Sequence, residues 1–129
     1  MILNIYQNVL ACVTKQKTCE RLIKAASNRK APQGSLHVLH VAKNAWNILD
    51  NSRESEALDY LFKTSKNYDA EMTMLRADNI SETIAAFALE HGIDLIVLGE
   101  SSNEHENKFF KQLRTLLKGT SVMIEVIPQ

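Results

Sequence analysis

Short apolar runs alternate with segments of helical periodicity along the whole sequence, and this alternation constrains the fold more than any other feature. Five runs are rich in Val, Ile, Leu, Ala and Met, and they lie at 8–14, 36–42, 71–76, 95–99 and 122–127. Such short runs are typical of strands in a buried sheet. Because parallel strands need a crossover between them, usually a helix, the alternation predicts a parallel α/β sheet.

Four segments between these strands carry apolar residues three or four positions apart, which predicts helices. They cover 18–28, 53–67, a segment between Asn79 and Gly92, and a segment from Phe109 to Leu117. Asn79, with Glu82 three residues on, resembles a capping box, and Gly92 suits a helix end. Residues 31–34 are predicted to break the chain between elements, and residues 100–108 to form a polar loop.

Right-handed crossovers between five such strands favour a three-layer, doubly wound parallel sheet, built from residues 1–129 as one domain. Run 71–76 is short and polar, so we place it at an edge. Run 95–99 is the most apolar, so we place it centrally. If the strand order is 3-2-1-4-5, the order reverses between the first and fourth strands.

The charge balance excludes several classes of function. The chain has 15 basic and 15 acidic residues, so no excess of cations favours nucleic acid or an anionic membrane surface. No apolar run approaches the roughly 20 residues that span a bilayer. Residues 1–8 are too short and uncharged for a secretory signal, so we expect a cytoplasmic protein.

The two cysteines and the histidines point to packing rather than chemistry. Cys12 and Cys19 are seven residues apart, a spacing that fits neither a redox pair nor a zinc site. Both are expected to be core thiols, although Cys19 falls near a helix start, where a thiol pKa can be lowered. His37 and His40 are three residues apart on one strand, so they face opposite sides and cannot share a metal.

The remaining candidate groups are weak. Residues 104–106, a Glu-His-Glu sequence, are expected to form a solvated loop tip rather than a metal site. No arrangement of nucleophile and base can be placed on one site, so no catalytic residue and no metal ligand is predicted.

In a doubly wound sheet, ligands bind beyond the carboxyl ends of the strands at the reversal point. The loops after the first and fourth strands meet there, and the first leads directly into a helix N-terminus, which attracts anions. His40 lies near the end of the second strand, where it could line the rim of the cleft, although a hydrogen-bonded packing role is the favoured interpretation. The alternative is that the two loops are only solvated connections. The candidate residues are Thr14, Lys15, Gln16, Lys17, Thr18, His40, Gly99, Ser101 and Ser102.

The five runs, with Gly99 and Ser101 after the fourth, resemble the universal stress protein family over nearly the whole chain. Residues 12–23, and Gly99 to Ser101 followed by Phe109 and Phe110, are most similar to the universal-stress-type domain of Kdp potassium sensor kinases. The resemblance implies the 3-2-1-4-5 sheet of adenine-nucleotide alpha hydrolase-like folds. It also implies a frequent homodimer through the last strand and, in some members, ATP binding.

The chain departs from the pattern of the ATP-binding members. They carry Asp where this chain has Thr14, and a glycine-rich motif of which only Gly99 remains. Ser102 stands at the second glycine, and Gln112 and Leu113 stand where Gly-Ser or Gly-Thr follows. The departures imply that ATP or AMP binds weakly or not at all, and that glycines at 102 and 112 with serine at 113 would improve affinity.

The last strand is expected to be an exposed edge and a dimer interface. It consists of Val122, Met123, Ile124, Glu125, Val126 and Ile127. Only Glu125 is charged, so the edge is poorly protected against pairing, and Glu125→Pro is expected to weaken a dimer. In the alternative, a flanking loop covers the edge and the protein is a monomer.

Three functions are compatible with these observations. The first is a non-catalytic cytoplasmic regulatory domain that dimerises and holds a small anionic ligand. The second is a nucleotide-binding protein that takes ATP, AMP or a cyclic dinucleotide between the first and fourth strands. The third is a weak ATPase, for which the sequence shows no general base or metal ligand.

Overall fold

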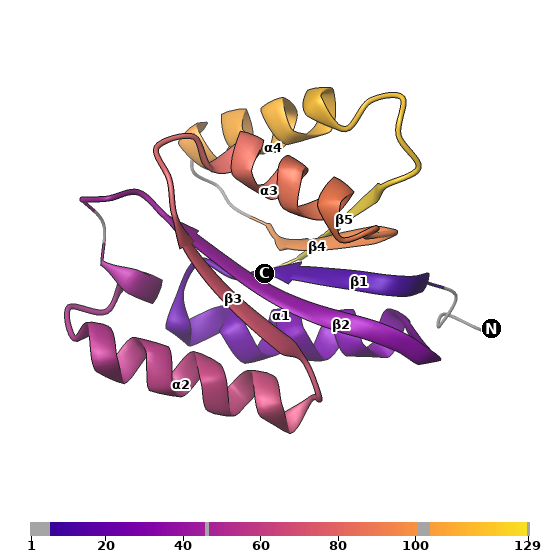
Figure 1. The fold of residues 1–129 in the computed structure, drawn as a ribbon. Helices are drawn as coiled ribbons and strands as arrows, with labels where there is room; N and C mark the ends of the chain where they lie inside the picture. The colour runs from indigo at the N-terminus through magenta and orange to yellow at the C-terminus, as the bar shows by residue number, and fades with distance from the viewer. Residues whose placement is uncertain (1–5, 46, 101–103, 129) are drawn as a thin grey trace.

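The computed structural model describes residues 6–45, 47–100 and 104–128, and it contains a five-stranded sheet in the order β3-β2-β1-β4-β5 (Figure 1). Every neighbouring pair of strands is parallel. The predicted fold class and strand order are therefore confirmed. The strands are β1 (Tyr6–Cys12), β2 (Lys30–Ala42), β3 (Glu71–Arg76), β4 (Leu95–Gly99) and β5 (Met123–Ile127).

Helices cover both faces of the sheet, which gives three layers (Figure 1). One face carries α1 (Gln16–Arg29), α2 (Glu54–Asn67) and the short 3₁₀ helix η1 (Ile48–Asp50), and the other carries α3 (Ile80–Glu90) and α4 (Glu104–Leu116). Side chains of β1 alternate between the two cores, because Val9 and Ala11 pack on the α1 face while Leu10 packs on the α3 face. Burial on both faces explains why the second half of β1, Val9 to Cys12, is apolar.

Local signals in the sequence place several boundaries correctly. The bounds of β3 and β4 are those predicted, and β3 is an edge strand. Asn79 caps α3, since its Oδ1 accepts a hydrogen bond of 3.0 Å from the backbone N–H of Glu82. Gly92 follows α3 with φ of 61°, the left-handed conformation that ends many helices.

The predicted break at residues 31–34 is wrong, because β2 already begins at Lys30. Tyr6 pairs with Lys30 and Asn8 pairs with Ser35, so the register shifts and the extra residues of β2 bulge from the ladder. The proline and glycine therefore mark an irregular strand rather than a loop.

Gly34→Ala is expected to destabilise the protein by about 1–3 kcal/mol, because the added methyl group has no room. A Cβ at Gly34 would lie 2.3 Å from the carbonyl oxygen of Gln7, a backbone atom of the neighbouring strand. The matched control is Gly99→Ala, whose Cβ would meet only the side chain of Leu22 at 3.4 Å. Urea denaturation of both variants is the measurement, and equal midpoints would contradict the expectation.

The predicted loop at residues 100–108 is also partly wrong, because α4 begins at Glu104. Residues 104–106 consequently belong to the first turn of a helix and not to a loop tip. The physical reason is that acidic residues suit the positive end of the helix dipole, so Glu104 and Glu106 favour a helix start.

Candidate functional site

The connection from β1 to α1 ends in a helix N-terminus without a side-chain cap. Thr14 and Lys15 are exposed, and Lys15 is the N-cap of α1 with extended backbone (φ −132°, ψ 142°). Its side chain makes no capping hydrogen bond, and the first turn contains no acidic residue. Thr18 is partly buried, and its N–H donates to the carbonyl oxygen of Lys15 at 3.3 Å. The start of α1 therefore has backbone N–H groups that could donate hydrogen bonds to an anion.

The end of β4 lies beside the same helix. Gly99 packs near Leu22 of α1, and the N–H of Glu100 donates to the carbonyl oxygen of Ile127 at 2.8 Å. The strand order places β4 beside β1, and Gly99 lies near Leu22, the seventh residue of α1. Ser101 and Ser102 lie outside the described residues.

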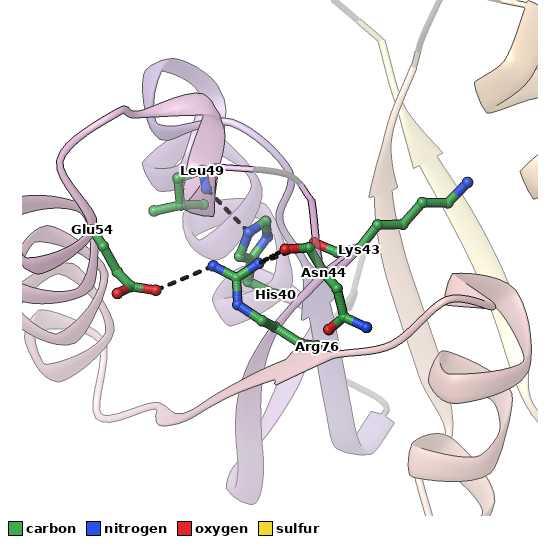
Figure 2. A network of polar contacts seen from close by, with 6 residues as sticks. All are labelled: His40, Lys43, Asn44, Leu49, Glu54 and Arg76. Atoms are coloured by element: carbon green, nitrogen blue, oxygen red, sulfur yellow. Dashed lines mark hydrogen bonds and ion pairs between the residues drawn. The ribbon is translucent and has the colours of Figure 1, made fainter.

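His40 does not line the rim of the cleft but has the hydrogen-bonded packing role that the sequence analysis favoured. It lies near the carboxyl end of β2, but only 3% of its surface is exposed. Its Nδ1 is 2.8 Å from the carbonyl oxygen of Val13, and its Nε2 accepts the N–H of Leu49 at 3.0 Å (Figure 2). The loop after β2 covers the imidazole, so His40 connects this loop with the end of β1 and does not face a ligand.

The loop after β2 contains the residues that sequence reasoning missed. Ile48 and Leu49 form part of η1 and are buried in the core on the α1 face. Leu49 has φ of 53° and ψ of 30°, a left-handed conformation that is uncommon for a residue with a side chain. Asn51 donates from Nδ2 to Oε1 of Gln16 at 3.0 Å, which ties this loop to the first residue of α1. In the sequence, the signal for this buried turn is the apolar pair Ile48 and Leu49 within a polar stretch.

Arg76 at the end of β3 holds the other end of that loop (Figure 2). Its Nη1 donates to the carbonyl oxygens of Lys43 and Asn44 at 3.0 and 3.3 Å. Its Nη2 donates to Oε1 of Glu54 at 3.1 Å, at the start of α2. One guanidinium therefore connects the ends of β2 and β3 with α2.

His37 faces the opposite side of β2 from His40, as predicted. Its ring centroid lies 6.1 Å from that of Phe87 and 5.5 Å from that of His91, both contributed by the α3 side. Its Nδ1 lies 3.7 Å from a carboxylate oxygen of Glu71. Within the described part of the chain, no three His, Cys, Asp or Glu side chains are grouped so that they could hold a metal ion.

Both cysteines are buried core thiols. Burial raises the pKa of Cys12 to about 12. Burial, with a further contribution from Glu20, raises the pKa of Cys19 to about 12. The suggestion that the helix start lowers the Cys19 pKa is wrong, because the thiol points into the core on the α1 face.

The two residues that replace the last glycine-motif positions lie in the interior of α4, not at a ligand site. Leu113 is fully buried in the core on the α3 face. Gln112 accepts a hydrogen bond of 2.6 Å from Oγ of Ser81 on α3. Gln112 and Leu113 lie within α4, which begins at Glu104, and a gain of affinity from substitutions there was expected only if these positions belonged to a loop of the family's shape.

Two backbone hydrogen bonds between β4 and β5 identify the free edge of β5. Met123 donates to the carbonyl oxygen of Asp94, and Ile127 accepts from Glu100, both at 2.8 Å. Because backbone direction alternates along a strand, Glu125 also faces β4, while Ile124 and Val126 face outward. Glu125→Pro was expected to weaken a dimer only if the Glu125 N–H is bonded across the interface; this N–H instead faces β4, so the proline would disrupt the sheet itself.

The side chain of Glu125 forms an ion pair with Arg29 of the same chain. Arg29 at the end of α1 donates from Nε and Nη2 to its two carboxylate oxygens at 2.6 and 2.7 Å. These hydrogen bonds hold the pKa of Glu125 below its usual value. The ion pair fixes α1 against β5 on one face of the edge strand.

A surface groove of about 310 Å³ lies between β3 and α3, away from both predicted loops. Its lining residues are Leu75, Glu82, Thr83, Ala86, Phe87 and Glu90.

None of the described helices has the length and apolar character needed to cross a membrane.

The comparisons with known proteins agree with this geometry. The model of the universal stress protein family matches residues 5–114. No curated protein matches the sequence. A universal stress protein in complex with cAMP has 12% sequence identity and a TM-score of 0.65, with 95% of this chain and 97% of that chain covered. A hypothetical protein has 19% identity and a TM-score of 0.59, with 95% of each chain covered.

One further structure is longer than this chain. The U34-tRNA thiolase NcsA from Methanococcus maripaludis, with its 4Fe–4S cluster, has 12% identity and a TM-score of 0.58. The match covers 97% of this chain but only about half, 52%, of that one. At such identities the likeness shows a common fold alone.

Proposed function

The chain belongs to the universal stress protein family, and on this premise we propose that it is a non-catalytic regulatory domain of the cytoplasm. In this proposal it dimerises through β5 and holds a small anionic ligand where β1 and β4 end. The observation that carries the ligand site is the start of α1, which has no side-chain cap and no acid in its first turn. Lys15 at the N-cap and Lys17, the second residue of α1, add positive charge.

Gly99 supports the same site from the other side. Its backbone is not left-handed, and a Cβ there would make only an ordinary contact of 3.4 Å with Leu22. Packing among the described residues therefore does not require glycine at this position. A glycine that packing does not require leaves the backbone of the β4 end open to a ligand.

Nucleotide binding is the second candidate function, and a specific observation favours it. A universal stress protein with the same fold is known in complex with cAMP. We propose that in this chain the nucleotide site is degenerate, because Thr14 replaces the acidic residue of ATP-binding members. Excess absorbance at 260 nm in the purified protein would favour this second function over the first.

Within the family, we propose that the chain is closest to the universal-stress-type domains of Kdp potassium sensor kinases. The support is residues 12–23, and Gly99 to Ser101 with Phe109 and Phe110. Phe109 and Phe110 are partly buried on α4. The assignment implies that the domain acts by contact with other protein parts rather than by turnover.

We expect ATP to bind more weakly than the low micromolar range, and sulfate or phosphate to bind at the start of α1. Isothermal titration of the purified chain with ATP, AMP, cAMP and sulfate measures both. Lys15→Ala combined with Lys17→Ala should abolish the anion affinity, because it removes both lysines from the helix start.

The matched control is Lys24→Ala combined with Lys111→Ala, which removes the same charge from two exposed positions outside the first turn of α1. An equal loss of affinity in both double variants would show that net charge, and not this site, holds the anion. A low micromolar dissociation constant for ATP would overturn the proposal of a degenerate site.

A further inference from the structure

His40 connects the two loops that border the proposed ligand site, and its two partners fix its protonation state. The carbonyl oxygen of Val13, 2.8 Å from Nδ1, can only accept, so Nδ1 carries the hydrogen. The backbone nitrogen of Leu49, 3.0 Å from Nε2, can only donate, so Nε2 carries none. His40 is therefore the neutral tautomer with the hydrogen on Nδ1.

We propose that neutral His40 is a positioning residue that holds residues 47–53 of the β2–α2 loop against the start of α1, and that protonation of His40 loosens this loop. The inference rests on the proposed function, since it names proton concentration as a signal that regulates the same ligand site. An imidazolium carries hydrogen on both nitrogens, so a protonated Nε2 would face the N–H of Leu49. The hydrogen bond would be lost, and a buried donor would remain without its acceptor.

Leu49 depends on this bond more than an ordinary loop residue would. Its left-handed backbone, with φ of 53°, is unfavourable for a residue with a side chain and persists only where the surroundings hold it. The side chains of Ile48 and Leu49 remain buried in the core on the α1 face. Loss of the His40 bond should therefore loosen the loop rather than unfold it.

The loop transmits its position to α1 through Asn51. This residue follows η1 and donates from Nδ2 to Oε1 of Gln16 at 3.0 Å. Its Oδ1 accepts the N–H of Arg53 at 2.9 Å, so the amide side chain is held from both ends. A change at Leu49 thus reaches the first residue of α1 through two residues of chain and one hydrogen bond.

The charged groups around His40 oppose its protonation. Burial is the main cause that lowers its pKa, the bond to Val13 acts in the opposite direction, and the cation of Arg76 on β3 lowers it further. Glu54 of α2 pairs with Arg76 and offsets part of that cation's effect. Lys43 on the loop and Lys15 before α1 are exposed. His40 is consequently neutral near pH 7, and the change belongs below that pH.

The size of the effect follows from proton linkage. In the closed loop the pKa of His40 lies below 6.5, the ordinary value that an opened loop would restore. The open state then binds more protons, so the equilibrium constant for opening rises as the pH falls below about 6.5. For one proton the rise is at most about tenfold per pH unit, and it levels off below the pKa of the closed state.

Amide hydrogen exchange of the full chain, followed by NMR from pH 7.5 to 5.0, tests the proposal. The protection factor of the Leu49 amide should be constant above about pH 6.5 and fall by up to about tenfold per pH unit below it. Long-range ¹⁵N spectra of the His40 ring should show hydrogen on Nδ1 at pH 7.5. Constant protection over the whole range, or hydrogen on Nε2 at pH 7.5, would overturn the proposal.

Two variants separate His40 from general acid effects. His40→Gln keeps an oxygen that can accept from Leu49 but does not titrate, so protection of Leu49 should become independent of pH. His37→Gln removes the other buried histidine, on the opposite face of β2, and should leave the wild-type response intact. Loss of the response in His37→Gln would show a global change and contradict the proposal, and the ring spectra of the wild type decide if His40→Gln does not fold.

Sulfate separates this proposal from the ligand site itself, because it keeps the same charge over this pH range. Its affinity should differ between pH 7.5 and 5.5 in the wild type and be the same at both pH values in His40→Gln. If sulfate binds at neither pH, the proposed anion site fails while the exchange of Leu49 still decides the role of His40. If Leu49 protection does not change, the His40 proposal fails whatever sulfate does.

Discussion

Leu113→Ser is expected to destabilise the protein by about 3–5 kcal/mol and to leave nucleotide affinity unchanged. Leu113 has no exposed surface and lies on the side of α4 that packs toward α3 and the sheet. The substitution removes most of an apolar side chain from a closed core and places a hydroxyl there. Denaturation in urea, read as the shift of the midpoint at constant slope, is the measurement.

The same helix supplies the matched control. Leu116 is 40% exposed, and Leu116→Ser is expected to cost no more than about 1 kcal/mol. Similar midpoints for the two variants would contradict the placement of Leu113 in the core. A gain of ATP affinity in Leu113→Ser would instead restore the view that this position belongs to a phosphate-binding motif.

The sequence was sufficient for the fold because its signals are local and agree with one another. The bounds of β3 and β4 followed from apolar runs, and Asn79 and Gly92 from the chemistry of helix ends. The start of β2 could not be found this way, because Gly34 is needed by the approach of Gln7 from the neighbouring strand. Sequence patterns within one segment carry no information about such a contact.

The site was only partly accessible to the same reasoning. The topology rule gave the strand order, which places β4 beside β1 with Gly99 near Leu22 of α1. It could not show that Leu49 would take a left-handed conformation and donate to His40, since both depend on the burial of Ile48 and Leu49 together. Arg76 likewise gained its role from three carbonyl and carboxylate partners that are distant in sequence.

Proline substitutions in β5 should separate the sheet from the proposed dimer. Glu125 faces β4, so Glu125→Pro removes a ladder bond and the ion pair with Arg29. We expect it to destabilise the fold by about 2–4 kcal/mol. Val126 faces outward, so Val126→Pro leaves the ladder to β4 intact and removes a donor only from the free edge.

If two copies pair through this edge, Val126→Pro should weaken their association at least about tenfold, or about 1.4 kcal/mol, with little change in the urea midpoint. Sedimentation velocity over a concentration series measures the first quantity and denaturation the second. Because neighbouring residues of a strand face opposite edges, Glu125→Pro should lower mainly the stability of the fold and Val126→Pro mainly the association of two copies. General damage to β5 would not separate these two quantities. A wild-type monomer at tens of micromolar would refute the dimer, and equal unfolding costs at both positions would refute the assignment of the free edge.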